Sequence, residues 1–253
     1  MRLKKSLSQH LLWNKKVAEK IVNFARIESN DEIVEIGSGT GILTRAMAIH
    51  AKKIYAVEID REMVKILKKN LAGFNNIEII EQDFLTLTIA HFNRPLIIGN
   101  IPYRITTRII KKLIDERDFF ARAILTMQRE YAQRLLARPG NKEYGSMTIF
   151  TGYHFRINRG FLIPPGQFRP RPKVSSMVVE FIRREINFGL EPDDLNGFFD
   201  FVKRLFCYRR KKISTIVKKL YGIALIYNRR PEELEIEELI NLYNNLRVPW
   251  QRF

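Results

Sequence analysis

The regular alternation of strand patterns with amphipathic helix patterns constrains the fold of this chain more than any other feature. Short apolar runs alternate with segments of helical spacing from residue 32 to residue 137. A helix between two strands carries the chain back across the sheet, so the strands lie parallel and helices cover both faces. The pattern predicts an α/β fold with parallel strands at Glu32–Ile36, Lys53–Glu58, Ile77–Glu81, Pro95–Gly99 and Ala121–Met127.

The pattern changes beyond Pro139 and Gly140. Phe161–Pro172 carries four prolines, which predicts an ordered loop or an edge rather than a helix. A strand is expected to resume at Val174–Ile182, and the polar stretch 185–194 is a candidate boundary. We therefore expect a first domain over residues 1–186 and a small helical domain over 187–253, with helices at Leu195–Phe206, Lys211–Leu220 and Pro231–Asn245.

The chain carries a large positive charge. Forty-four basic and 27 acidic residues give a net charge of +17, and residues 200–220 alone hold eight basic residues against one acid. A clustered basic surface favours a polyanionic partner, although a merely soluble basic surface is the alternative. Nucleic acid is the expected partner, and its backbone is expected to contact a basic cluster of six residues: Lys203, Arg204, Arg209, Arg210, Lys211 and Lys212.

Other features exclude several classes of protein. The single cysteine, Cys207, cannot form an internal disulfide, which is typical of a reducing compartment. The sequence has no apolar run near the length of a membrane span, and its basic start lacks the apolar stretch of a signal peptide. We expect a cytoplasmic protein with no membrane partner. Four scattered histidines and one cysteine form no ligand cluster, so no metal is expected.

A glycine-rich turn follows the first predicted strand. Residues 35–41 include Gly37, Gly39 and Gly41, which allow a tight turn and a close approach to a ligand, although a structural turn alone explains them equally well. Glu58 ends the second strand, where a carboxylate can accept both hydroxyls of a ribose, and Asp83 follows the third, where it can accept from an adenine amine. These features predict a pocket for an adenosine-bearing cofactor. The spacing G-x-G-x-G resembles that of S-adenosylmethionine-dependent methyltransferases, and a dehydrogenase is the alternative.

Residues 100–103, Asn-Ile-Pro-Tyr, follow the fourth strand directly. An exocyclic adenine amine is a poor nucleophile, and two acceptors on its hydrogens would favour a pyramidal nitrogen. The Asn100 amide oxygen and the Pro102 carbonyl can act as those acceptors, and Tyr103 offers a face on which an extruded base can stack. The alternative is a proline turn with a buried tyrosine.

Taken in order, these segments make the chain resemble the ribosomal RNA adenine N6-dimethyltransferases. Together the matching segments span nearly the whole sequence, and the ordered set is specific although no single motif is. They are Ser8–Leu12, Glu35–Gly41, Glu58, Asp83, Asn100–Tyr103, Met127–Glu130, Pro139–Gly145 and Phe168–Ser176.

The resemblance implies a Rossmann-like methyltransferase fold with a small C-terminal helical domain, which binds S-adenosylmethionine and releases S-adenosylhomocysteine. It implies that Phe168 stacks on the target adenine from the face opposite Tyr103. It also implies a monomer that acts on ribosomal RNA within an assembling small subunit. The residues that it implies at the cofactor are His10, Leu12, Gly37, Glu58, Asp83 and Asn100, with Gly39 in the same turn.

The family has two catalytic branches. One dimethylates two adjacent adenosines near the 3′ end of small-subunit rRNA, and residues 139–145 and 201–212 resemble that branch. The other modifies one adenosine of large-subunit rRNA and confers macrolide resistance, and Ile101 together with the short chain is compatible with it. We expect the small-subunit activity. A non-catalytic RNA-binding assembly factor is a further alternative.

Overall fold

The chain forms two compact units in the computed structural model, which describes residues 10–185, 190 and 194–246. The first unit comprises Met1–Ala132 and Arg156–Arg183, and the second comprises Gln133–Phe155 and Arg184–Phe253. The sequence predicts that 133–155 belong to the first domain, with one boundary after residue 186, a position that lies outside the described residues. The structure differs because Tyr144, Ile149 and Tyr153 pack into the same apolar cluster as the C-terminal helices.

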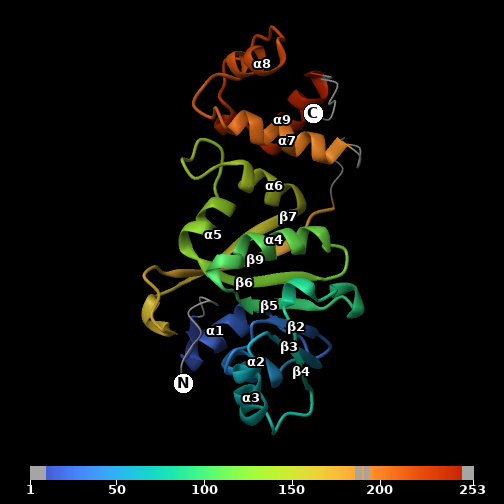
Figure 1. Ribbon diagram of the computed structural model, residues 1–253, viewed down its shortest axis with the longest axis vertical. Helices are drawn as coiled ribbons and strands as arrows, with labels where there is room; N and C mark the ends of the chain where they lie inside the picture. Colours follow the sequence, from blue (N-terminus) through green and yellow to red (C-terminus); the bar gives the residue numbers. More distant parts are fainter. Residues whose placement is uncertain (1–9, 186–189, 191–193, 247–253) are drawn as a thin grey trace. The chain divides into compact units, whose positions relative to one another are not determined.

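A seven-stranded sheet in the order β4-β3-β2-β5-β6-β9-β7 forms the centre of the first unit (Figure 1). Its first five strands are parallel, as the sequence predicts, and β9 is antiparallel to β6. The strands are β2 (Glu32–Ile36), β3 (Lys53–Glu58), β4 (Ile77–Glu81), β5 (Leu96–Asn100), β6 (Arg122–Gln128), β7 (Phe155–Ile163) and β9 (Ser176–Arg183).

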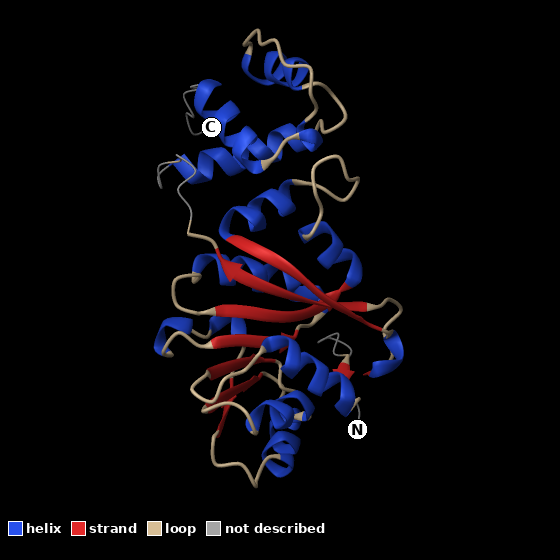
Figure 2. Ribbon diagram, turned by 180° about the vertical axis from the view of Figure 1, so that it is seen from behind, coloured by secondary structure: helices blue, strands red, loops and turns tan. Residues whose placement is uncertain are grey.

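Helices cover both faces of this sheet (Figures 1 and 2). The helices α1 (Lys15–Ala25), α2 (Ile42–Ala48) and α3 (Arg61–Asn70) contribute to apolar clusters that lie against one face. On the other face lies α4 (Thr106–Asp115), whose Ile109, Ile110, Leu113 and Ile114 are buried, and α5 (Arg129–Leu135) follows β6.

Two strand features of the first unit were not predicted. No sequence signal predicts β7, because Arg156, Arg159 and Gly160 interrupt the alternation expected of a strand. A Cβ at position 160 would lie 2.7 Å from the Val178 carbonyl oxygen, so glycine lets the neighbouring strand approach closely. In addition, β1 (Leu11–Leu12) pairs antiparallel with β8 (Phe168–Arg169) in a separate two-stranded sheet.

The second unit is helical where it is described. Its helices are α6 (Ser146–His154), α7 (Leu195–Phe206), α8 (Ile213–Tyr221) and α9 (Ile236–Leu246). The prediction of a continuous helix over 231–245 is wrong, because a 3-10 turn at Pro231–Glu233 precedes α9. Leu234 between them is extended and fully buried, so its burial interrupts the helical run. Within the described ranges, no helix is long and apolar enough to cross a bilayer.

Candidate active site

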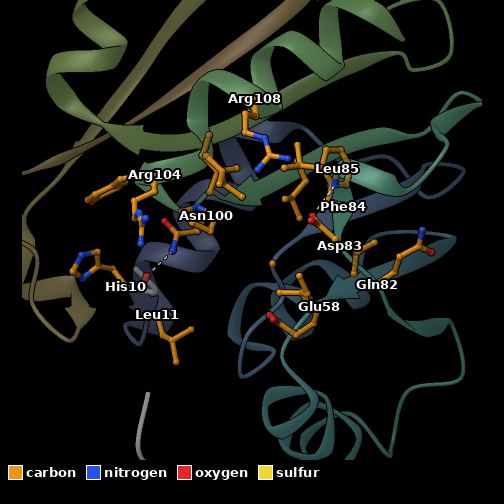
Figure 3. Close-up of a pocket in the computed structure, with 18 residues that line it drawn as sticks. His10, Leu11, Glu58, Gln82, Asp83, Phe84, Leu85, Asn100, Arg104 and Arg108 are labelled. Carbon is orange, nitrogen blue, oxygen red and sulfur yellow. Dashed lines mark hydrogen bonds between the residues drawn. The ribbon is translucent and has the colours of Figure 1, made fainter. Parts of the chain in front are cut away.

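A cavity of about 420 Å³ opens at the carboxyl ends of the parallel strands (Figure 3). This is the edge where open α/β sheets bind ligands, and the volume suits a small organic molecule. Both halves of the predicted site line this one cavity. Its walls are His10, Leu11, Ile36, Gly37, Val57, Glu58, Ile59, Gln82, Asp83, Phe84, Leu85, Asn100, Ile101, Pro102, Tyr103, Arg104, Ile105 and Arg108.

The glycine-rich turn is fixed to the neighbouring strand. The amides of Gly37 and Ser38 both donate to the Val57 carbonyl, at 2.9 and 3.1 Å. Gly37 and Gly39 have φ of 67° and 55°, where a side chain would be strained. A Cβ on Gly39 would lie 2.8 Å from the Leu11 side chain, whereas a Cβ on Gly37 would meet nothing within 4 Å. The backbone at position 37 therefore faces open space that a ligand can approach.

The Glu58 carboxylate is buried and held by two backbone amides. Gly39 N–H donates to Oε2 and Asp60 N–H to Oε1, each at 2.9 Å, and the residue is 3% exposed. Burial raises the pKa of Glu58, while these amides oppose the rise. Because each carboxylate oxygen can accept more than one hydrogen bond, the group can still receive the hydroxyls of a ribose.

Asp83 lies on the same side of the cavity as Glu58 (Figure 3). Its Oδ1 accepts from the Leu85 amide at 2.9 Å and caps the 3-10 turn Phe84–Thr86. Its Oδ2 accepts no hydrogen bond from the residues that the structure describes. One oxygen thus fixes the side chain, and the other remains available to a donor in the cavity.

A hydrogen bond from Asn100 to the backbone of His10 orients the Asn100 amide (Figure 3). Asn100 Nδ2 donates to the His10 carbonyl at 2.8 Å, which leaves Oδ1 as a free acceptor. The His10 ring makes a separate contact, because Nδ1 donates to the Pro170 carbonyl at 2.7 Å. His10 lines the cavity as expected, and its backbone carbonyl holds Asn100 in place.

The carbonyl of Pro102 is already engaged within the chain. It accepts from the Ile105 amide at 3.1 Å and from Thr106 Oγ1 at 3.5 Å. By contrast, the Ile101 carbonyl oxygen accepts none of the hydrogen bonds recorded for the described part of the chain. Pro102 therefore lines the cavity as predicted, but Ile101 offers the freer acceptor beside Asn100.

Tyr103 stands at the cavity wall with its hydroxyl fixed. The hydroxyl lies 2.7 Å from Ser176 Oγ, and the ring centroid lies 5.3 Å from that of His10, with the rings tilted by 37°. Burial raises the pKa of Tyr103, while the bond with Ser176 opposes the rise. The sequence did not identify Ser176 as a site residue, because only the antiparallel insertion of β9 beside β6 brings it here.

Phe168 does not line the cavity, contrary to the expectation that it faces Tyr103. It is 2% exposed, pairs with Leu12 across β1 and β8, and packs in the core cluster that includes residues of α1 and the sheet. Leu12 is also buried, but it lines a second, small cavity of about 20 Å³ together with Gly39 and Asn100.

Glu35, at the start of the glycine-rich turn, is buried beneath the site. Thr44 Oγ1 donates to its Oε2 at 2.5 Å. Burial raises the pKa of Glu35 from the ordinary 4.5 to about 7, and the charge of Glu58 adds to the rise. The folded chain thus holds this proton more tightly than the unfolded chain does. The contribution of Glu35 to the free energy of unfolding should therefore fall by about 3 kcal/mol as the pH rises from 4.5 to 7, and should stay level above 7.

Glu35→Gln should flatten this part of the stability curve, because glutamine keeps an acceptor for Thr44 and has no charge to bury. The measurement is the free energy of unfolding in urea at pH 5, 6, 7 and 8. Glu19→Gln, on the exposed side of α1, is the control and should leave the curve unchanged. If the free energy of unfolding of Glu35→Gln changes with pH as much as that of the wild type, Glu35 does not cause the pH dependence.

The predicted basic cluster lies in the second unit and is only partly free of ion pairs. Arg209 Nη2 lies 2.7 Å from a Glu232 carboxylate oxygen, and Lys203 lies 3.0 Å from Asp200. Lys212 donates to Asn228 at 3.3 Å. Exposed Arg204, Arg210 and Lys211 have no carboxylate partner within the described residues, which leaves them as the cluster's free cations.

Among the residues that the structure describes, no three His, Cys, Asp or Glu side chains come together in a way that could hold a metal ion.

Comparisons with known proteins match most of the chain. The family model described as ribosomal RNA adenine dimethylase matches residues 1–241. A ribosomal RNA small subunit methyltransferase A of Syntrophus aciditrophicus is 38% identical, over 96% of this chain and 93% of the relative. The protein of that name from Chlorobium phaeobacteroides is 36% identical, over 97% of this chain and 94% of the relative.

Two solved structures are similar in fold and sequence. A dimethyladenosine transferase from Plasmodium falciparum has a TM-score of 0.79 and 28% identity, covering 92% of this chain and 96% of the other. The 23S rRNA methyltransferase ErmE has a TM-score of 0.75 and 25% identity, covering 93% of this chain and 99% of the other. These similarities are to methyltransferases that share the sheet and the helices described above.

Proposed function

Since the chain belongs to the ribosomal RNA adenine dimethylase family, we propose that it methylates the N6 amines of two adjacent adenosines near the 3′ end of small-subunit rRNA. The methyl donor is S-adenosylmethionine, and two transfers to each amine give N6,N6-dimethyladenosine. The enzyme acts as a monomer in the cytoplasm, on rRNA within an assembling small ribosomal subunit.

The observation that carries this proposal is the single cavity shared by two sets of polar groups. Glu58 and Asp83 line one part, and Asn100 and Tyr103 line another. An adenosine-bearing cofactor fits the first part, because a buried carboxylate and the open space beside Gly37 suit a ribose and its attached chain. The two parts are continuous, so a donor and an acceptor of a methyl group can meet there.

The cofactor supplies an electrophilic methyl group on a sulfonium when it is bound. Asn100 Oδ1 and a carbonyl of the Ile101–Pro102 segment accept the two hydrogens of the target amine. These acceptors direct the nitrogen lone pair toward the methyl group. Positive charge develops on the nitrogen in the transition state, so fixed acceptors stabilise that state more than the ground state.

Other residues of the site hold the target adenine, the Asn100 side chain and the cofactor in place. Tyr103 stacks against the extruded adenine, and the Ser176 contact fixes its ring. His10 anchors Asn100 through its backbone carbonyl. Glu58 accepts from the ribose hydroxyls, and Asp83 accepts from the cofactor's adenine amine. No general base is needed, because the methylated ammonium is acidic enough to lose its proton to water.

The curated relatives favour the small subunit over the large one. Relatives named for the small ribosomal subunit are 32–38% identical to this chain, whereas ErmE, named for 23S rRNA, is 25% identical. A non-catalytic assembly factor would not need Asn100, Glu58 and Asp83 in one cavity. Incubation of rRNA with S-adenosylmethionine labelled in the methyl group separates the two classes: an enzyme gives multiple turnovers, and a binding factor gives stoichiometric binding without transfer.

The free cations of the basic cluster should contact the rRNA backbone. Changing Arg204, Arg210 and Lys211 together to Gln should weaken rRNA binding and leave S-adenosylmethionine binding intact. The slope of log K against log salt should become shallower by roughly 0.7–0.9 per lost phosphate contact. Arg209 stays unchanged in this variant, because its pairing with Glu232 supports the fold of the second unit.

The control variant changes Lys65, Lys68 and Lys69, which are exposed on α3, to Gln. It removes the same net charge from the first unit and should change the salt slope less. Filter binding at four salt concentrations measures both slopes. Equal slopes for the cluster variant and the wild type would show that the basic cluster makes no phosphate contact.

A further inference from the structure

Trp13 is an exposed aromatic side chain that the fold holds in place. It is 43% exposed, and it is not among the residues of the core clusters. Its indole Nε1 donates to the Gly166 carbonyl at 3.0 Å, and its backbone amide donates to the Gln167 carbonyl at 3.2 Å. Two hydrogen bonds thus fix a large apolar ring at the surface, and such a ring commonly marks a binding surface.

The guanidinium of Arg169 stacks on this ring. Its Cζ lies 4.6 Å from the ring centroid, and Arg169 is fixed in turn because it pairs with Leu11 across β1 and β8. Indole rings and guanidinium planes are the side-chain surfaces on which unpaired RNA bases stack. Trp13 and Arg169 together offer a preformed surface of this kind, here called the Trp13–Arg169 platform.

The platform lies close to the proposed slot for the target base. Trp13 is three residues from His10, and three residues span about 10 Å at most. The His10 ring contacts Tyr103, and its backbone holds Asn100. Stacked nucleotides follow one another at about 3.4 Å, so the backbone separation between Trp13 and His10 corresponds to roughly three nucleotide steps at most.

The charge around the platform suits RNA. The exposed side chains near it in sequence include Lys15, Lys16, Arg171 and Lys173. None of these four has an ion-pair partner among the residues that the structure describes. Unpaired cations beside an aromatic platform are typical of sites for single-stranded nucleic acid, where the cations contact phosphates and the platform contacts bases.

We propose that the Trp13–Arg169 platform stacks on an unpaired rRNA base that neighbours the target adenosine. The inference rests on the proposed function, since it assumes an RNA strand at the cavity. Extrusion of the target base leaves its neighbours without a stacking partner on one side. The platform replaces that partner, and so it strengthens the binding of the strand beside the cavity.

Intrinsic fluorescence tests the contact directly. Trp13 and Trp250 are the two tryptophans of the chain, so Trp250→Phe leaves Trp13 as the single tryptophan, which is excited selectively at wavelengths that tyrosine does not absorb. A single-stranded oligoribonucleotide with two adjacent adenosines should quench this emission as it binds. An abasic backbone of equal length should bind through its phosphates without quenching. Unchanged emission at RNA concentrations that saturate the protein, as judged by anisotropy of labelled RNA, would overturn the proposal.

Kinetics on small-subunit rRNA separate stacking from anchoring. Trp13→Ala should raise KM for the RNA by about 5- to 150-fold at unchanged kcat and unchanged affinity for S-adenosylmethionine. Trp13→Phe keeps an aromatic face but loses the bond to Gly166, and it should retain most of the RNA affinity. Equal losses of RNA affinity in the two variants would show that Trp13 acts through its hydrogen bond to Gly166, and would contradict the stacking proposal.

Phe119→Ala is the matched control, because Phe119 is 46% exposed but follows α4, at the opposite end of the strands from the cavity. It should leave KM unchanged. Failure of the wild type to methylate any rRNA would overturn the proposed function itself. A wild type that methylates, with Trp13→Ala at wild-type KM, would overturn only the platform.

Discussion

Asn100→Ala should lower the rate of methyl transfer by roughly 10²–10³, the usual loss when one transition-state hydrogen-bond partner is removed. The variant loses the Oδ1 acceptor that the bond to His10 leaves free. RNA affinity should change little, because Asn100 contacts only the target amine, whereas most of the affinity comes from contacts with the phosphates. Single-turnover kinetics with saturating S-adenosylmethionine measures the chemical step, and calorimetry measures cofactor binding separately.

A structural asparagine provides the control for this variant. Asn76 Nδ2 donates to the Ala48 and Ala51 carbonyls, each at 2.9 Å, and it does not line the cavity. Asn76→Ala should lower the melting temperature and leave the single-turnover rate of the folded enzyme unchanged. If Asn100→Ala keeps a near wild-type single-turnover rate, Asn100 has no part in the transfer step.

Phe168→Ala should destabilise the first unit by about 3–5 kcal/mol, the usual cost of removing a fully buried phenylalanine. The melting temperature should fall by roughly 6–20 °C, since 1 kcal/mol corresponds to about 2–4 °C in a domain of this size. Activity per folded molecule at low temperature should change little, because the ring packs in the core and not on the cavity wall.

Phe168→Leu keeps most of the buried volume and should cost less than about 1.5 kcal/mol. Scanning calorimetry and activity at 15 °C, measured on both variants, distinguish packing from base stacking. A variant with wild-type melting temperature and lost activity would show instead that Phe168 contacts the adenine, as the family resemblance implied.

The fold of the first unit could be predicted from sequence because its signals are local. Buried parallel strands show as apolar runs, and helices show their periodicity. The strands β2 to β6 therefore lie where the pattern predicts them, and each strand end agrees within one residue. The carboxyl ends of parallel strands meet at one edge, which is why Glu58, Asp83 and Asn100 line one cavity.

What could not be predicted depends on contacts between distant segments. The strand β7 lies at the sheet edge, and Arg156 and Arg159 break up its apolar residues, so the pattern of a buried strand is missing. Segment 133–155 joins the second unit because Tyr144 and Tyr153 fit a cluster built by α7 and α9. The burial of Phe168 follows from the pairing of β1 with β8, which joins residues more than 150 positions apart. The hydrogen bonds that engage Pro102 form only in the turned backbone.

The most direct test is to map modified adenosines after methylation of a mixture of small and large ribosomal subunits whose rRNA lacks N6-methylated adenosines. The purified protein and S-adenosylmethionine should produce N6,N6-dimethyladenosine at two adjacent positions near the 3′ end of the small-subunit rRNA, and Asn100→Ala should produce little or none in the same time. Label found only in large-subunit rRNA, or no label with intact RNA binding, would contradict the account.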